Sequence, residues 1–203
     1  MSYEVKNFEN LLGLAGFSDQ MLKNHFALYQ GYVNNFNKLN DILVVMEKDG
    51  KYGIPEYAEL NRRLGWEFNG MRLHELYFGN LTKNTDLHGL NADLYGQLYK
   101  KIIKEFGSYE FFEKDFRAVG VMRGIGWVVL YYDKIGDRLF NVWVNEHDAG
   151  HFSGCVPLLV MDVFEHAYML DYGIKRVDYI EAFIKAIDWE VVNSRINCLS
   201  EPE

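Results

Sequence analysis

Two residue types that bind metals stand four positions apart in the last quarter of the chain, at Asp162 and His166. They follow an apolar run at 156–160 that is typical of a buried strand. If the backbone turns helical at Asp162, both side chains lie on one helix face and can bind the same ion. A carboxylate with an imidazole suits a metal of intermediate hardness, such as Fe, Mn or Zn. The alternative is an ordinary helix start, with Asp162 as an acidic N-terminal residue and His166 in the core.

The first element that must position other ligands is a long helix near the N-terminus. Apolar residues recur at helical spacing from Met21 to about 49–50, and Ser18 or Asp19 can serve as the N-cap. His25 lies inside this helix. A single histidine on a helix is most often just a partly buried polar residue, so His25 alone does not indicate a site.

A second long helix is expected to begin at Pro55, a favourable first-turn residue. Its apolar pattern continues to about residue 81, with an interruption predicted near Gly65 or Gly70. His74 lies in this helix. The two helices together predict an N-terminal helical hairpin that carries one histidine on each arm.

The remainder of the chain alternates helix and strand patterns. Turn-rich residues at 82–89 predict a domain boundary, and Ser108 is a predicted N-cap. Helices are expected at 92–106, 109–118, 178–187 and 190–197, and strands at 127–132, 139–144 and 156–160. The fold class is therefore α+β. We expect a helical hairpin domain at 1–84 and a C-terminal domain at 85–203, with a three-stranded antiparallel sheet and flanking helices.

Composition limits the possible partners. The chain has 203 residues, of which 49% are hydrophobic, so it can bury a substantial core. A formal net charge of −8 argues against nucleic acid or an anionic membrane as a partner. Cys155 and Cys198 suggest no disulfide framework and fit a reducing compartment. No signal-peptide pattern or membrane-length apolar run is present in the sequence, so we expect a cytoplasmic protein.

The motif D-V-F-E-H-A-Y at 162–168 resembles the D-V-W-E-H-A-Y signature of the iron/manganese superoxide dismutases. That signature is long and specific. Further segments resemble the same family, so the likeness covers nearly the whole chain: Tyr32-Val33-Asn34-Asn35, Phe68 to Leu81, Gly107 to Phe112, Arg123 to Leu130 and Asp188 to Asn193.

The resemblance implies a metal site and a reaction. It implies that one Fe or Mn ion per subunit is held by His25, His74, Asp162 and His166. Three neutral imidazoles and one carboxylate leave an open position on a redox metal. The implied reaction is the disproportionation of superoxide to dioxygen and hydrogen peroxide, with Tyr32 in the proton relay.

The first helix departs from the family pattern in its spacing. Tyr32 follows His25 by seven residues, whereas the family tyrosine follows its histidine by eight. Two helical turns take about 7.2 residues, so Tyr32 is still expected on the His25 face. The family's second histidine in this helix is replaced by Tyr29, at a position that serves the access channel in the family. Gly70 stands where iron-type members carry a glutamine.

The loop at 145–151 offers three candidates for the residue that bonds the metal-bound solvent. Manganese-type members carry a glutamine here, and some members use a histidine. If Asp148 matches the family aspartate, His147 takes that role, whereas an ungapped count from Asp162 places Glu146 there. We favour His147, because a carboxylate would repel a metal hydroxide while an imidazole can donate a hydrogen bond. His151 is a weaker candidate, and a solvated loop histidine is the alternative for His147.

Two further residues take roles from the resemblance. Glu165 is implied to reach across a two-fold axis to the ligand histidine His166 of the other subunit, which predicts a homodimer. Arg176 falls where the family has an arginine at the funnel mouth, so it is expected to guide the anionic substrate. The proline that follows this arginine in the family is Val177 here.

Two hypotheses follow for the function. The first is an active superoxide dismutase. The second is a catalytically inactive relative that keeps the fold as a scaffold or binding protein, since Tyr29, Gly70 and several tryptophan replacements depart from the family pattern. The four retained ligand types favour the enzyme. Another mononuclear metal reaction is a third possibility, but no phosphate loop or nucleophile motif supports it.

Overall fold

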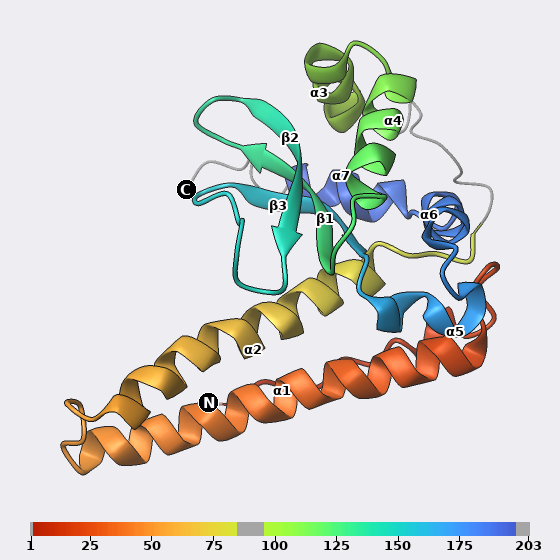
Figure 1. Ribbon diagram of the computed structural model, residues 1–203. Coiled ribbons are helices and arrows are strands. Elements are labelled where there is room, and N and C mark those ends of the chain that lie inside the picture. Colours follow the sequence, from red (N-terminus) through yellow and green to blue (C-terminus); the bar gives the residue numbers. More distant parts are fainter. Residues whose placement is uncertain (1, 85–95, 198–203) are drawn as a thin grey trace.

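A long helical hairpin lies beneath a small sheet and its helices in the computed structural model, which describes residues 2–84 and 96–197 (Figure 1). The hairpin consists of α1 (Asp19–Lys48) and α2 (Pro55–Gly79). A short 3-10 helix, η1 (Glu9–Leu11), precedes it in an otherwise irregular lead-in. The predicted boundary after residue 84 falls next to residues 85–95, which lie outside the described residues, as do the predicted helix start at residue 92 and Cys198.

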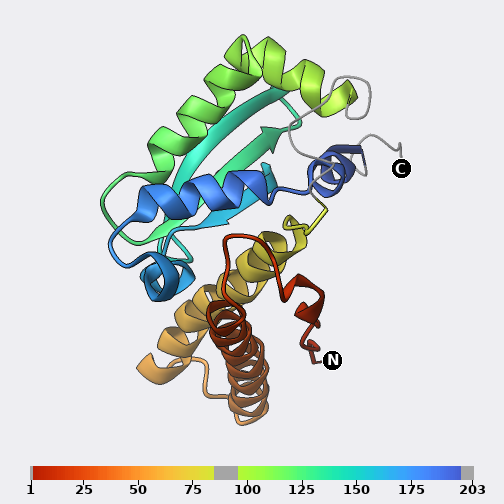
Figure 2. The ribbon, with the colours of Figure 1, turned by 90° about the vertical axis from the view of Figure 1, so that its right-hand side faces the viewer.

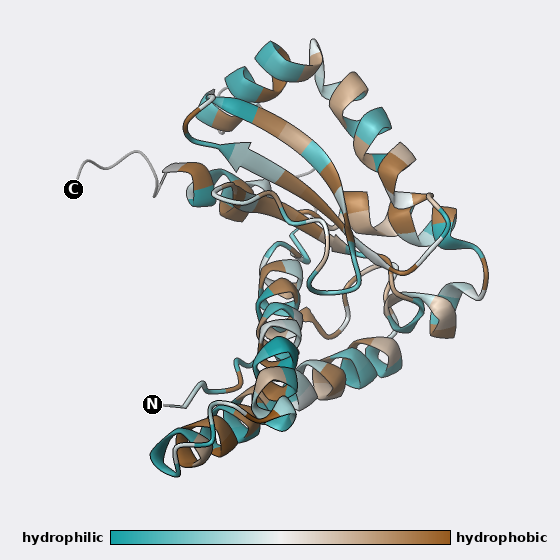
Figure 3. Ribbon diagram, turned by 60° about the vertical axis from the view of Figure 1, so that its left-hand side comes forward, coloured by the Kyte–Doolittle hydropathy of each residue, from teal (hydrophilic) through white to brown (hydrophobic). Residues whose placement is uncertain are grey.

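Helix α1 begins as its sequence predicts. The Ser18 side chain accepts a hydrogen bond from the Met21 backbone N–H at 3.1 Å, which makes Ser18 the N-cap. Apolar and polar segments alternate along both hairpin helices (Figure 3), as expected where one face packs against the partner helix. Helix α2 begins at Pro55 and is continuous through Gly65 and Gly70, so the predicted interruption is wrong. Packing against α1 offsets the cost of two glycines inside a helix.

The predicted three-stranded antiparallel sheet is confirmed. It consists of β1 (Gly126–Asp133), β2 (Arg138–Asn145) and β3 (Val156–Asp162) in the order β2-β1-β3. The central strand β1 pairs with β2 over its whole length, from Gly126 opposite Asn145 to Asp133 opposite Arg138. It is buried over its first six residues, because both neighbours and the helices cover it.

The segment after β3 differs from the prediction. A shared helix face for Asp162 and His166 requires the backbone to turn helical at Asp162, but β3 continues through Asp162, which pairs with Trp127. The Asp162 side chain then accepts the Phe164 backbone N–H at 2.8 Å, a local turn that competes with helix formation. A 3-10 helix, η3 (Glu165–Ala167), and the short α5 (Met169–Tyr172) follow. His166 therefore stands on a 3-10 turn, four residues beyond the end of a strand.

Most of the remaining helices pack against the sheet. These remaining helices are α3 (Gly96–Phe106), α4 (Tyr109–Gly120), α6 (Arg176–Lys185) and α7 (Trp189–Asn197). Ser108 caps α4 by accepting the Phe111 backbone N–H, as predicted. Figure 2 shows α4 and α6 lying in front of the sheet. None of the helices within the described residues is long and apolar enough to cross a membrane.

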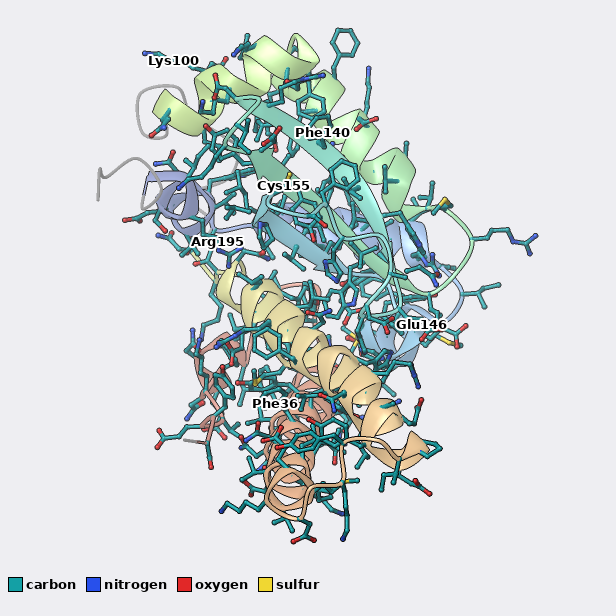
Figure 4. All side chains as sticks on the ribbon, turned by 90° about the vertical axis from the view of Figure 1, so that its left-hand side faces the viewer. Phe36, Lys100, Phe140, Glu146, Cys155 and Arg195 are labelled. Atoms are coloured by element: carbon teal, nitrogen blue, oxygen red, sulfur yellow. The ribbon has the colours of Figure 1, made fainter. Side chains whose placement is uncertain are left out.

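A buried polar joint connects the end of α2 to β3. The Asn80 side chain exchanges hydrogen bonds with the Val160 backbone, at 3.2 Å to its carbonyl and 3.0 Å from its N–H. Arg195 on α7 donates to the carbonyl oxygens of Leu76 at 2.8 Å and Leu158 at 2.5 Å. Figure 4 shows Arg195 where α7 meets this end of α2. The joint fixes α2 and β3, which carry His74 and Asp162, relative to each other.

Candidate metal centre

Four side chains from the two halves of the chain converge on one point. The ligand atoms of His25, His74, Asp162 and His166 all lie within 4.8 Å of one another. Asp162 Oδ2 is 3.1 Å from Nε2 of His166, 3.2 Å from Nε2 of His25 and 3.7 Å from Nε2 of His74. The structure thus brings together the four residues that the resemblance implied as ligands.

The two hairpin histidines are held by helices. His25 is 2% exposed on α1 and His74 is fully buried on α2, with ring centroids 5.0 Å apart. The Nδ1–H of His74 donates to the Gly70 carbonyl oxygen at 2.5 Å. This bond leaves Nε2 of neutral His74 without a proton and directed at Asp162, which is the form that binds a metal.

The electrostatics of the cluster favour a cation. Burial lowers the pKa of His25, and burial lowers the pKa of His74 well below its usual value, so both imidazoles are neutral at pH 7. Burial alone would raise the pKa of Asp162, but His166 and His25 beside it hold that pKa well below its usual range. The site is therefore a carboxylate anion surrounded by imidazoles.

The donor set fits a metal ion. Nε2 of His25 and Nε2 of His74 are both buried without a hydrogen-bond partner. A buried nitrogen without a partner costs folding free energy, and one metal ion bound by both nitrogens would remove that cost. Three imidazoles and one carboxylate suit iron or manganese as ligands.

Tyr32 and His147 lie beside the cluster and bond to each other. Nε2 of His147 is 2.8 Å from the Tyr32 hydroxyl oxygen, and Trp127 donates its indole N–H to Nδ1 of His147 at 3.1 Å. Because Trp127 can only donate, neutral His147 carries its proton on Nε2 and donates it to Tyr32. Burial lowers the pKa of His147 to about 4, so it is neutral at pH 7. Burial and the charge of Asp162 raise the pKa of Tyr32, which keeps the phenol protonated.

The three loop candidates are placed differently. His147 is fully buried against Tyr32. Glu146 is exposed, with a left-handed φ of 51°, and accepts the indole N–H of Trp66 at 3.3 Å. The His151 ring bonds to the Tyr131 hydroxyl and to the His147 carbonyl oxygen. Of the three, only His147 has its side chain in contact with Tyr32.

Sequence reasoning missed Trp66 as part of this site. Its ring centroid lies 4.4 Å from that of His147 and 5.5 Å from that of Tyr32. The Arg63 guanidinium covers the outer side of the indole at 3.8 Å. Trp66 precedes His74 by eight residues on a continuous α2, so the helical repeat would have placed both on one face. The expected interruption of α2 concealed that relation.

Tyr29 is buried, with its ring centroid 6.4 Å from that of His74. Its hydroxyl donates to the buried Glu75 carboxylate at 3.0 Å and accepts the Lys6 backbone N–H at 3.1 Å. Its ring packs on Phe8 of the N-terminal lead-in, with centroids 5.7 Å apart. Tyr29 therefore connects the lead-in to the hairpin, and burial raises its pKa to about 12.

Glu165 and Arg176 line one surface hollow. Glu165 is exposed on η3. The Arg176 guanidinium donates to the carbonyl oxygens of Met122 and Gly124, each at 2.7 Å, and to the Tyr168 hydroxyl at 3.2 Å. Arg176 thus holds the turn that precedes β1, on the same side of the molecule as Glu165.

The fold and the donor set define a class of protein: a mononuclear metal protein whose ligands come from a helical hairpin and from an α+β region. Comparison with known proteins makes the class specific. The family model described as iron/manganese superoxide dismutases, C-terminal domain, matches residues 94–195.

Curated relatives extend the match over most of the chain. The iron superoxide dismutase of Aquifex pyrophilus is 35% identical, over 95% of this chain and 90% of the relative. A manganese superoxide dismutase of Haloferax volcanii is 34% identical, over 85% of this chain and 83% of the relative. The iron superoxide dismutase of Methanothermobacter thermautotrophicus is 35% identical, over 87% and 84%. The chain belongs to the iron/manganese superoxide dismutase family, whose named members are oxidoreductases.

Proposed function

We propose that the protein is an active superoxide dismutase that binds one Fe or Mn ion per subunit through His25, His74, Asp162 and His166. The observation that carries this proposal is the convergence of three imidazole Nε2 atoms on one carboxylate oxygen, two of them buried without a hydrogen bond. When bound, such an ion supplies one-electron cycling between its +2 and +3 states. Two superoxide anions and two protons then give one dioxygen and one hydrogen peroxide.

Tyr32 is proposed to donate a proton for the reaction, and His147 to orient the Tyr32 hydroxyl. The single N–H of His147 is directed at the Tyr32 oxygen, so the phenol hydrogen of Tyr32 is not used in this bond. Tyr32 can therefore donate its own hydrogen toward the cluster, and the bond from the His147 N–H stabilises the phenolate oxygen that this leaves until solvent returns a proton. The low pKa of His147 keeps the imidazole uncharged, which avoids repulsion of a metal cation.

Gly70 bears on which residue can bond the metal-bound solvent. A Cβ atom at position 70 would lie 2.6 Å from the Tyr32 ring, so no larger side chain fits without displacing Tyr32. A glutamine from α2 is thereby excluded from this position. His147, which enters from the other half of the chain, is proposed to replace it. This arrangement is compatible with either metal.

A symmetric homodimer is proposed around Glu165. Exposed apolar residues surround Glu165, Tyr168 and Arg176 on one hollow surface: Val121, Met169, Ile174 and Val177. His166, whose side chain is 29% exposed, lies close to the same surface on η3. A two-fold axis here would let each Glu165 reach the His166 of a second copy. The expectation of a cytoplasmic location stays a prediction.

Metal content and dismutation measured on the same purified protein test the proposal. The protein is reconstituted separately with Fe and with Mn, next to Asp162→Ala and a control, Asp41→Ala, on the exposed part of α1. We expect about one ion per chain and turnover near the diffusional ceiling of about 10⁸–10⁹ M⁻¹s⁻¹ for at least one metal, both lost only in Asp162→Ala. Bound metal without turnover would support the inactive scaffold. No binding of either metal would refute the metal site.

A further inference from the structure

The loop that carries His147 is tight and closed on itself. Asn145 and Ala149 exchange backbone hydrogen bonds, at 2.7 Å from the Asn145 N–H and 3.3 Å from the Ala149 N–H. Between them Glu146 adopts a left-handed backbone, which is strained for a side chain other than glycine. The loop conformation therefore depends on contacts that hold it from outside.

One such contact is made by His151 to the backbone of His147. His147 is fully buried, so its carbonyl oxygen needs a hydrogen-bond partner within the protein. Nε2 of His151 lies 2.8 Å from that oxygen. Since a carbonyl oxygen can only accept, the proton of neutral His151 must be on Nε2.

Tyr131 selects this tautomer. Its hydroxyl is 2.7 Å from Nδ1 of His151, which has no proton in the Nε2–H form and so accepts the phenol hydrogen. Tyr131 is only 3% exposed on β1, and the ring of Phe152 stacks on it at 6.0 Å. The donor is thus itself fixed by packing.

The same strand fixes both histidines in the same way. Trp127 donates to Nδ1 of His147, and Tyr131 donates to Nδ1 of His151. Each donor leaves the histidine with its proton on Nε2. One Nε2–H then meets the Tyr32 oxygen, and the other holds the carbonyl oxygen of the first histidine.

We propose that His151 is a positioning residue for the reaction: with Tyr131 it fixes the backbone at His147 and thereby the place of the His147 Nε2–H at Tyr32. This inference rests on the proposed dismutase function. Both ring nitrogens of His151 are used in these bonds, so His151 acts through His147. Figure 4 shows Glu146 of this loop at the level where the sheet region meets α2, as expected for a loop that inserts His147 between the two halves.

Substitutions distinguish the bond from Tyr131 to His151 from the bond between His151 and the His147 carbonyl oxygen. Tyr131→Phe removes only the hydroxyl that selects the tautomer, and Tyr132→Phe is its matched control, because the Tyr132 hydroxyl bonds to Asp137 at 3.0 Å instead. His151→Phe removes both bonds while keeping a planar ring. His151→Gln retains one donor and one acceptor, so it should rescue the bond to the His147 carbonyl.

Steady-state kinetics of the metal-loaded proteins give the first readout. We expect His151→Phe to lower kcat about 10-fold with KM nearly unchanged, at the low end of the about 10–100-fold losses that follow changes beside metal ligands. Tyr131→Phe should lower kcat about threefold, His151→Gln should recover most of the loss, and Tyr132→Phe should match the wild type. Unchanged kcat in both His151→Phe and Tyr131→Phe would overturn the proposal. If His151→Phe does not fold, Tyr131→Phe against Tyr132→Phe decides.

Nitrogen NMR of the full-length, metal-free chain gives a second readout that needs no turnover. The wild type should show both His147 and His151 as Nε2–H tautomers. Tyr131→Phe should mix the tautomers of His151 and shift the His147 signals, whereas Tyr132→Phe should do neither. If wild-type turnover is absent, the proposed function fails, and these signals still decide whether His151 positions His147. Unchanged His147 signals in Tyr131→Phe would refute the positioning.

Discussion

The helical half and the sheet half hold their parts of the site by different means. His25 and His74 stand on α1 and α2 among packed rings, and His74 bonds to the Gly70 carbonyl oxygen within α2. On the sheet side, Asp162 accepts the Phe164 N–H, and His147 is bonded by Trp127, Tyr32 and His151. Activity should therefore be most sensitive to side-chain packing in the hairpin and to hydrogen bonding in the His147 loop.

The buried polar joint of Asn80 and Arg195 connects the two halves. Removing its hydrogen bonds should have the largest effect on stability. Arg195 is mostly buried, which lowers its pKa to about 10, and it donates to two backbone carbonyl oxygens, of Leu76 and Leu158. Arg195→Met would leave both oxygens unsatisfied. We expect a loss of about 3–4 kcal/mol in the free energy of unfolding, measured with urea.

Arg62→Met is the control for this change, because Arg62 is exposed and its ion pair with Glu59 lies on the surface. It should change the free energy of unfolding by less than about 0.5 kcal/mol. Equal losses of unfolding free energy in the two variants would show that the polar joint does not stabilise the fold.

Gly70→Ala tests how strongly stability and activity depend on side-chain packing in the hairpin. The added methyl group would lie 2.6 Å from the Tyr32 ring, so Tyr32 must move. We expect a loss of about 2–3 kcal/mol and slower turnover, since overpacking costs about 1–3 kcal/mol and Tyr32 is displaced as well. Gly65→Ala, where nothing lies within 4 Å, should instead stabilise α2 by about 0.5–1 kcal/mol. A neutral Gly70→Ala would mean that the hairpin tolerates changes in shape.

His147 should make stability pH-dependent on the sheet side. Its pKa is about 4 in the folded chain and 6.5 as the usual value, so the unfolded chain binds the proton first as the pH falls. The metal-free wild type should then lose about 2 kcal/mol more than His147→Gln between pH 7 and pH 5, with the loss complete below about pH 4. Urea titrations at each pH measure the difference. Parallel pH profiles for the two proteins would show that His147 is not buried as a neutral group.

The two serine caps provide the smallest test. Ser108→Ala removes one cap bond from α4, which typically costs about 1 kcal/mol. Ser18 caps α1 and also bonds Asp171 through both its N–H and its hydroxyl, each at 2.6 Å. Ser18→Ala should therefore cost a few tenths of a kcal/mol more than Ser108→Ala in thermal unfolding. The reverse order would indicate that the Asp171 contact contributes nothing.

Local signals in the sequence predicted most of the fold. Caps at Ser18 and Ser108, Pro55 at a helix start and alternating apolar runs gave the helices and strands, because these signals act within a few residues. The continuation of β3 through Asp162 was not predicted, because it depends on pairing with Trp127, far away in the chain. The unbroken α2 likewise depends on packing against α1.

The candidate site was predicted in its residue types but not in its contacts. The seven-residue step from His25 to Tyr32 placed both toward the cluster, since a helix repeats regularly. A charge argument favoured His147 over Glu146, and the structure places His147 against Tyr32. The tautomers set by Trp127 and Tyr131, and the cover formed by Trp66, required the three-dimensional arrangement.

The division of the ligands between the two halves has a mechanical consequence. Because α1 and α2 supply two ligands while β3 and η3 supply the others, a bound ion would act as a cross-link between the halves. Neither half alone offers more than two ligands from this set. If opening of the polar joint at Asn80 and Arg195 releases the ion, its dissociation rate would measure how often the halves separate.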